Sequence, residues 1–88
     1  MSKTARGVLI TGASSGIGAA LCLRWAECCE TLFICGRDEK RLNDVANQVF
    51  EAGFKRPHAA VIDVGDADGM KIWMQKCNQI TPLDIVHA

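Results

Sequence analysis

A glycine-rich octapeptide near the amino terminus is the segment of this sequence best suited to chemistry. It reads Thr-Gly-Ala-Ser-Ser-Gly-Ile-Gly over residues 11–18 and follows the apolar run 8–10. Gly12 permits a tight turn, Gly16 leaves the backbone open to a close ligand, and Gly18 permits a helix to pack closely on a strand. The pattern therefore predicts a turn between a strand and a helix that binds phosphate groups.

The residues around the last two glycines supply hydrogen-bond donors for such a ligand. Backbone N–H groups near Ile17 stand at the start of the helix, where the helix dipole also favours an anion. Ser14 and Ser15 add hydroxyl donors. A nucleoside triphosphatase loop needs Gly-Lys-Ser/Thr at its end, and Ile-Gly-Ala stands there instead. An ordinary glycine-rich helix cap and a methyltransferase loop remain as alternatives, the latter weakened because no acidic residue directly precedes Gly12.

Composition narrows the class of protein. Ten basic residues balance ten acidic ones, which gives no electrostatic footprint for nucleic acid. The apolar stretches are too short to span a membrane, and the amino terminus does not resemble a secretory signal. The cysteines are odd in number and form no Cys-x-x-Cys pair; they are Cys22, Cys28, Cys29, Cys35 and Cys77. We expect reduced thiols in a cytoplasmic protein, with no metal site.

Alternating periodicities predict four strands and three helices around the octapeptide. Strand-like runs cover residues 7–11, 31–35, 59–63 and 83–88. The helix over 16–30 is expected to bury Ile17, Leu21, Trp25 and Cys28. A second helix, capped by Asp38 and ended by Gly53, is expected to bury Leu42, Val45, Ala46, Val49 and Phe50. A third, capped by Asp66, is expected to bury Met70, Trp73, Met74 and Cys77.

The alternation of strand and helix predicts an α/β fold with a parallel sheet. Right-handed crossovers favour the strand order 3-2-1-4, with two helices on one face and one on the other. This is one half of a doubly wound, Rossmann-type fold, so we expect residues 1–88 to be the amino-terminal part of one such domain. The fourth strand would be an apolar edge, which predicts either a fragment or a unit completed by another copy.

The octapeptide resembles the phosphate loop of the short-chain dehydrogenase/reductase family, Thr-Gly-x-x-x-Gly-x-Gly, at every fixed position from Thr11 onward. Further similarities follow in order: Cys-Gly-Arg over 35–37, Asp63-Val64, and the run 83–88, which in the family continues into Asn-Ala-Gly. The resemblance covers essentially the whole chain. It implies that the octapeptide holds a dinucleotide, that Asp63 and Val64 lie at the adenine, and that Ala88 belongs to the cofactor site.

The residues after the second strand indicate which dinucleotide is bound. Enzymes that prefer NAD place an acidic side chain there, on the ribose 2′-hydroxyl. Gly36 stands at that position, and Arg37 follows with a guanidinium suited to a 2′-phosphate. We therefore predict NADP(H) in preference to NAD(H). One alternative is a solvated Arg37 paired with Asp38 or Glu39. The other is an Asp63 that only caps the next turn.

The family's catalytic residues have no counterpart here. In the family a Tyr-x-x-x-Lys pair and a serine act on the substrate carbonyl, and this chain has no tyrosine. Ser14 and Ser15 belong to the loop. His87, expected on the same face of the last strand as Leu83 and Ile85, is more typical of a packed residue. His58 is expected in an exposed loop. Asp84 and His87, three apart on a strand, should face opposite sides.

The sequence therefore predicts the NADP(H)-binding portion of a short-chain oxidoreductase that interconverts a carbonyl and an alcohol. This chain alone should hold the cofactor without catalysing the reaction. The parent protein would act on a small-molecule substrate and form a homo-oligomer. The alternative is a stand-alone, non-catalytic nucleotide-binding or partner module. The substrate is not indicated.

Overall fold

The computed structural model describes residues 5–13, 16–63 and 65–87, with backbone alone for Gly16 and Ile17. Seven elements follow one another along the chain. They are β1 (Ala5–Thr11), α1 (Gly16–Cys28), β2 (Cys29–Gly36), α2 (Glu39–Glu51), β3 (His58–Val61), α3 (Ala67–Ile80) and β4 (Leu83–His87). The predicted alternation of strands and helices is confirmed. Several boundaries differ from the expected ones by two residues: β1 and β2 begin two residues earlier, and β3 ends two residues earlier.

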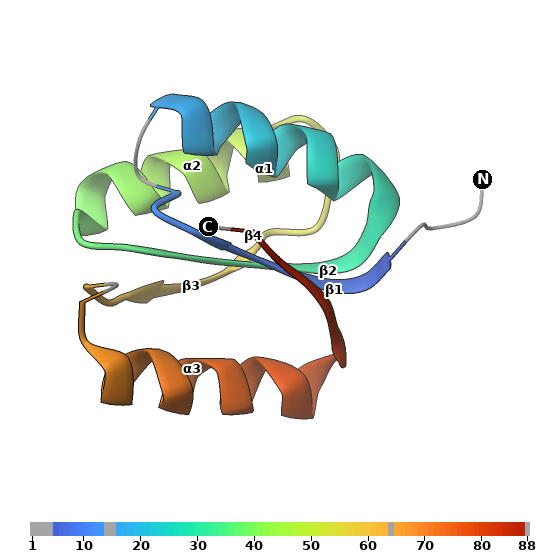
Figure 1. The fold of residues 1–88 in the computed structure, drawn as a ribbon. Helices are drawn as coiled ribbons and strands as arrows, with labels where there is room; N and C mark the ends of the chain where they lie inside the picture. The colour runs from blue at the N-terminus through green and yellow to red at the C-terminus, as the bar shows by residue number, and fades with distance from the viewer. Residues whose placement is uncertain (1–4, 14–15, 64, 88) are drawn as a thin grey trace.

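The strands form one parallel sheet in the predicted order β3-β2-β1-β4. Figure 1 shows α1 and α2 together on one face and α3 alone on the other. This arrangement follows from the buried, apolar strands β1 and β2, which lie at the centre of the sheet and need cover on both faces. The predicted half of a doubly wound fold is thus confirmed.

The buried face of α1 is not the one expected. The α1 side chains in the core are Cys22 and Ala26, whereas Leu21, Trp25 and Cys28 are only half-buried. The small residues face the sheet because α1 packs so tightly on the turn after β1 that larger side chains are displaced to the flank. The side chain of Ile17 is not among those that the structure describes, so its burial stays a prediction.

Helix α2 follows its predicted pattern except at its carboxyl end. The Asp38 carboxylate accepts a hydrogen bond from the Arg41 N–H at 3.1 Å, which is the expected amino-terminal cap. Gly53 follows the helix with a φ of 100°. The predicted burial of Phe50 is wrong, because its side chain is 60% exposed. The core positions of α2 are Leu42, Val45, Ala46 and Val49.

Helix α3 covers its face of the sheet more thinly. Asp66 caps it as predicted, with its carboxylate accepting from the Gly69 N–H at 3.0 Å. Of the stripe expected to be buried, Cys77 alone is fully buried; Met70, Trp73 and Met74 are half-buried. They pack on Leu9, Phe33 and Cys35 of the sheet. One helix cannot fully enclose a face that two helices cover on the other side.

A bulge at the start of β4 changes which residues share a face. Gly7 pairs with Leu83, but Val8 pairs with Ile85, so two β4 residues occupy one step of β1. Leu83 therefore packs on the α3 side and Ile85 on the α1 side. The expectation that Leu83, Ile85 and His87 lie on one face is wrong. The alternation argument that separated Asp84 from His87 fails for the same reason.

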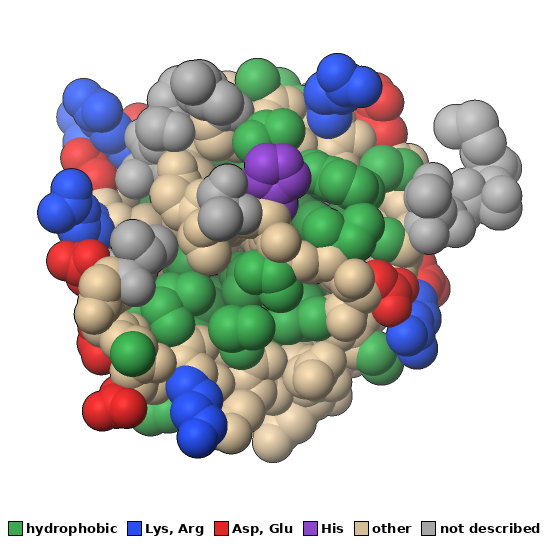
Figure 2. Space-filling model, in the orientation of Figure 1, with side chains coloured by type: hydrophobic (Ala, Val, Ile, Leu, Met, Phe, Trp, Pro, Cys, Tyr) green, Lys and Arg blue, Asp and Glu red, His purple; other side chains and the backbone are tan. Residues whose placement is uncertain are grey.

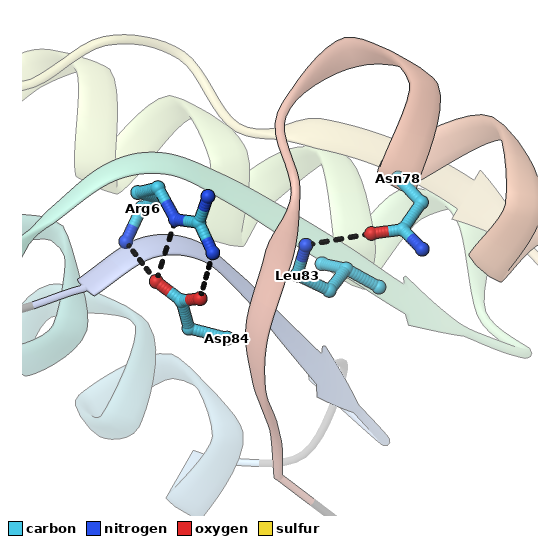
Figure 3. Close-up of polar contacts among 4 residues, drawn as sticks. All are labelled: Arg6, Asn78, Leu83 and Asp84. Atoms are coloured by element: carbon cyan, nitrogen blue, oxygen red, sulfur yellow. Dashed lines mark hydrogen bonds and ion pairs between the residues drawn. The ribbon is translucent and has the colours of Figure 1, made fainter.

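Polar contacts hold this bulge in place. The Arg6 guanidinium and backbone N–H donate to the Asp84 carboxylate at 2.8–3.2 Å. On the other side, the Asn78 side-chain oxygen accepts from the Leu83 N–H at 2.8 Å. Figure 3 shows both contacts at the point where β4 joins β1. They fix the register of the edge strand.

None of the described helices is long and apolar enough to cross a bilayer. The five cysteines form no disulfide. Burial raises the pKa of the Cys22 thiol to about 12 and that of Cys77 to about 12. These two side chains therefore behave as small apolar residues, as predicted.

Candidate functional site

The carboxyl ends of all four strands meet at one edge of the sheet, because the strands are parallel. β1 ends at Thr11, β2 at Gly36, β3 at Val61 and β4 at His87. Figure 1 shows the end of β1 and the start of α1 on the same side of the molecule. In open α/β sheets, ligands bind outside this edge at the place where the chain order reverses. Here that place lies between β1 and β4.

Two glycines of the octapeptide are required by geometry. Gly12 has a φ of 67°, a conformation that other residues rarely adopt, and the position of a Cβ there is open space. A Cβ on Gly18 would lie 2.6 Å from the Ala13 Cα and 2.8 Å from the carbonyl oxygens of Gly12 and Ala13. Gly18 therefore brings α1 against the turn, and Gly12 leaves its outer side open to a ligand.

The remaining loop residues are placed only in part. Gly16 and Ile17 open α1, so their backbone lies at a helix amino terminus as predicted. Ser14 and Ser15 lie outside the described residues, as do Val64 and Ala88, so their predicted roles stay predictions.

Hydrogen bonds join the turn to both neighbouring strands. The Thr11 hydroxyl donates to the His87 carbonyl oxygen at 3.3 Å, which ties the end of β1 to the end of β4. The Ala13 N–H donates to the Cys35 carbonyl oxygen at 3.1 Å, which ties the turn to β2. Thr11 thus joins the ends of β1 and β4, and the turn after β1 is hydrogen-bonded to β2.

The residues predicted to choose the cofactor lie beside this turn. Gly36 is buried at the end of β2, pairs with Val61 and presents no side chain. Arg37 follows it and is exposed. The Asp38 carboxylate caps α2 and pairs with Arg41 at 3.6 Å. Within the described part of the chain, the expected alternative of an Arg37–Asp38 pair is therefore not seen.

Asp63 is placed at the same edge but two residues beyond the end of β3, rather than closing it as predicted. Its carboxylate accepts from the Gly65 N–H at 2.9 Å, and its carbonyl oxygen accepts from the Asp66 N–H at 2.8 Å. Asp63 thus shapes the turn that leads into α3. The turn-capping alternative is observed, and a contact with adenine stays a prediction.

One contact at the site has no signal in the sequence. The Cys35 thiol, fully buried in β2, donates to the Met70 sulfur of α3, and the two sulfur atoms lie 3.9 Å apart. Burial raises the pKa of this thiol, and a hydrogen bond from the Gly12 backbone opposes that rise. A cysteine at a strand end reads as a small apolar residue, so periodicity alone cannot indicate such a contact.

The comparisons with known proteins agree with this geometry. The model of the short chain dehydrogenase family matches residues 6–88, almost the whole chain. The chain belongs to the short-chain dehydrogenase family.

Individual family members resemble the chain over the same region. Sulfoacetaldehyde reductase 2 of Chromohalobacter salexigens is 44% identical over 59 residues, which make up 67% of this chain and 23% of that protein. Dehydrogenase/reductase SDR family member 7B of Xenopus laevis is 32% identical over 68 residues, or 72% of this chain and 21% of that protein. The chain therefore spans less than a quarter of the length of these curated relatives.

A solved structure shows the same fold. The crystal structure of an actinorhodin polyketide ketoreductase variant with NADPH is 25% identical and superposes with a TM-score of 0.84. The match covers 98% of this chain and 33% of the ketoreductase chain. The β3-β2-β1-β4 sheet with its three helices is thus the architecture of a short-chain dehydrogenase.

Two grooves flank β4 in this short-chain dehydrogenase chain. One, of about 480 Å³, lies against α3 and includes Met74, Leu83 and Val86; the other, of about 420 Å³, lies against α1 and includes Trp25 and His87. Figure 2 shows hydrophobic side chains gathered on the face where β4 lies in Figure 1. A third hollow lies beside Cys29 and Phe54, near the amino end of β2 and away from the carboxyl ends of the strands. None of its lining residues is a predicted site residue.

The structure places His58 against an aromatic ring and gives Asp84 an arginine as its partner. His58 is the first residue of β3 rather than part of a loop, and its ring stacks on Phe33 with centroids 5.3 Å apart. The Asp84 carboxylate is engaged by Arg6, not by His87. Among the described residues, no group of three His, Cys, Asp or Glu side chains is placed to hold a metal ion.

Proposed function

We propose that this chain is the NADP(H)-binding portion of a short-chain oxidoreductase that interconverts a carbonyl and an alcohol. The observation that carries the proposal is the turn after β1, where the φ of Gly12 and the close approach of Gly18 build an open cradle at the start of α1. A dinucleotide pyrophosphate fits such a cradle because the backbone N–H groups at the start of a helix and the helix dipole both favour anions.

The residues around the cradle fit a dinucleotide in a defined direction. The pyrophosphate would lie at Gly12 to Gly18, with Ser14 and Ser15 as further donors. The adenosine end would extend over the ends of β2 and β3, toward Arg37 and Asp63, because these strands lie on the far side of β1 from β4. The nicotinamide end would then lie at β1 and β4. The bound cofactor would supply or accept the hydride.

The choice of NADP(H) rests on the end of β2. Gly36 has no side chain to accept a hydrogen bond from a ribose 2′-hydroxyl, and the exposed Arg37 can donate to a 2′-phosphate. Because the Asp38 carboxylate is already engaged by α2, it does not compete for Arg37. The NADPH in the related ketoreductase structure supports the same choice.

Titration of the chain with NADPH and NADH tests this proposal directly. NADPH should bind more tightly, and Arg37→Asp should abolish that preference by removing the partner of the 2′-phosphate and adding a like charge. Lys40→Ala is the matched control: it removes an exposed cation from the same segment and should leave the preference unchanged. Equal binding of the two cofactors by the unmodified chain, or the same loss in both variants, would overturn the assignment.

Catalysis is assigned to residues that this chain does not contain. The family's proton donor is a tyrosine, and the sequence has none, so we propose that the chain binds cofactor without turning over substrate and contains no catalytic residue. Hydride transfer to any carbonyl compound by the 88-residue chain would contradict this. A small-molecule substrate, homo-oligomeric assembly of the parent protein and a cytoplasmic location stay predictions.

A further inference from the structure

Met70 of α3 contacts both the core and a surface groove. Its sulfur accepts a hydrogen bond from the thiol of Cys35, which is fully buried in β2, and the two sulfur atoms lie 3.9 Å apart. The Met70 side chain packs on the buried cluster that includes Leu9 and Phe33. Met70 is nevertheless only half-buried, and it lines the groove of about 480 Å³ beside β4. A small molecule in that groove can therefore reach a side chain that contacts the core.

The cysteine in contact with Met70 also holds the turn of the proposed cradle. The carbonyl oxygen of Cys35 accepts a hydrogen bond from the Ala13 N–H at 3.1 Å. Ala13 follows Gly12, and its Cα is the atom that a Cβ on Gly18 would approach to 2.6 Å. One residue, Cys35, thus lies between the Met70 sulfur and the backbone of the turn.

We infer that Met70 is a modification site, where a peroxide converts the thioether to the sulfoxide and thereby weakens NADP(H) binding at the cradle. With hydrogen peroxide, a lone pair of the sulfur attacks one oxygen, an S–O bond forms and the O–O bond breaks. The proton of the transferred oxygen moves to the departing hydroxide, which leaves as water. The sulfur is oxidised by two electrons and the peroxide is reduced. The effect on NADP(H) rests on the proposed function, whereas the modification itself does not.

The chemistry of the neighbouring sulfur atoms favours oxidation at a thioether. A thiol reacts with peroxide as its thiolate. Burial raises the pKa of the Cys35 thiol and raises that of Cys77 to about 12, so both stay protonated near neutral pH. A thioether needs no deprotonation, because its lone pairs are available at any pH. The sulfur atoms of Met70 and Met74 are therefore the ones in this cluster that an oxidant attacks first.

Oxidation changes what Met70 brings to the cluster. The sulfoxide oxygen is strongly polar, and its burial beside Leu9 and Phe33 costs free energy. The oxidised side chain either carries that oxygen into the apolar cluster or turns toward the groove and loses its contact with Cys35. Both outcomes disturb the packing of Cys35, whose carbonyl oxygen holds the Ala13 N–H.

Met74 provides a matched comparison one turn further along α3. It lines the same groove, packs on the same cluster and is also half-buried. Among the described residues, however, no hydrogen bond joins its sulfur to Cys35. Oxidation of Met74 should therefore leave the turn unchanged.

Amide hydrogen exchange of Ala13, measured by NMR on the full 88-residue chain before and after treatment with hydrogen peroxide, tests the inference. Dithiothreitol added after the treatment reverses sulfenic acids and disulfides but leaves sulfoxides, and peptide mass mapping identifies the oxidised methionines. With Met70 oxidised, exchange at Ala13 should accelerate about tenfold, the effect of losing one hydrogen bond, relative to the core amides of Val8 and Ile34. The two methionine sulfoxide reductases, one for each epimer, should reverse the change.

Two leucine variants separate Met70 from the other oxidisable residues. Met70→Leu conserves volume and cannot be oxidised at this position, so peroxide should leave its Ala13 exchange unchanged. Met74→Leu should respond to peroxide as the unmodified chain does. The inference is wrong if Met74 is fully oxidised while Met70 is not, or if Ala13 exchange stays the same once Met70 is oxidised. An equal response of Met70→Leu and the unmodified chain would also contradict it.

NADPH binding then tests the consequence for the cofactor. Peroxide treatment should weaken NADPH binding several-fold in the unmodified chain and in Met74→Leu, and should leave it unchanged in Met70→Leu. An untreated chain that does not bind NADPH would refute the proposed function, while the exchange experiment would still decide whether oxidation of Met70 reaches the turn. Unchanged NADPH affinity in an oxidised chain with fast Ala13 exchange would refute the effect on cofactor binding.

Discussion

The two faces of the sheet differ in how completely they are covered. On the face of α1 and α2, buried side chains of both helices, such as Cys22 of α1 and Leu42 and Val49 of α2, share one core cluster with Val8 and Ile10. On the face of α3, Cys77 is the one fully buried helix residue, and its neighbours are half-buried. The cradle touches both faces, through Gly18 on one and Cys35 on the other. The turn after β1 therefore packs closely on α1 at Gly18 and is hydrogen-bonded to Cys35, whose sulfur contacts Met70 of α3.

The largest expected effect comes from truncating one helix side chain on each face of the sheet and comparing the losses in stability. Leu42→Ala should lower the free energy of unfolding by about 2–5 kcal/mol, because it empties a fully enclosed position. Met74→Ala, half-buried under α3, should cost about 1 kcal/mol, since water can reach the space that it leaves. Urea unfolding of both variants measures the difference. Equal losses would show that the α3 face contributes as much packing energy as the α1/α2 face.

Gly18→Ala tests how firmly the dense face sets the cradle. The added Cβ would meet backbone atoms of Gly12 and Ala13 at 2.6–2.8 Å, so α1 or the turn must move. We expect a loss of about 1–3 kcal/mol in unfolding free energy and weaker NADPH binding. Ala20→Ser, at an exposed position of the same helix, should change neither. A Gly18→Ala chain as stable as the parent would mean that the turn adapts without strain.

Alkaline pH probes one thiol on each face. Cys22 and Cys77 stay protonated in the folded chain because burial raises the pKa of each to about 12, whereas in the unfolded chain they ionise near 9.0. Their contribution to stability is therefore complete below pH 9 and is lost as the pH rises toward 12. At pH 10 each of the two thiols should lower the free energy of unfolding by about 1 kcal/mol relative to its value at pH 8.

Separate variants assign that loss to the two faces. Cys22→Ala and Cys77→Ala should each reduce the fall in stability between pH 8 and pH 10, measured by urea unfolding at both values. If the thin α3 face admits water more readily, the reduction will be smaller for Cys77→Ala. A fall that neither substitution alters would show that other groups cause it.

The smallest effect is expected outside both cores, at the bulge of β4. Arg6 holds the pKa of the Asp84 carboxyl below its ordinary value through hydrogen bonds and charge. The contribution of the ion pair is therefore present above pH 3.8 and is lost as the pH falls through the lowered pKa of Asp84 in the folded chain. Because the pair is exposed, Asp84→Asn should lower the melting temperature only slightly at pH 7.

The pH dependence of that small difference identifies its cause. The melting temperatures of the parent chain and Asp84→Asn should converge in strong acid, where Asp84 is protonated. Asp44→Asn, on an exposed position of α2, is the control and should show no comparable convergence. A difference that persists unchanged at pH 2 would point to the bulge geometry rather than to the charge.

Much of the fold could be predicted because the local signals agree with one another. The apolar runs of the strands, the caps at Asp38 and Asp66 and the end of α2 just before Gly53 are local properties, and each was predicted from the sequence. The failures have tertiary causes. Phe50 is exposed because α2 faces the sheet only through its central stripe, and the bulge reverses the facing of Leu83 because β4 must match the register of β1.

The sequence by itself determined the family, the strand order and the location of the cradle. The spacing of the glycines and the periodicity of the apolar residues are local properties, so they can be recognised without the tertiary structure. Only the tertiary structure decided which side chains meet at the site. Residues far apart in sequence are brought together there, as when Ala13, Cys35 and Met70 converge from a turn, a strand and a helix. The spacing of residues specifies a backbone path, whereas contacts between paths depend on how closely the elements pack.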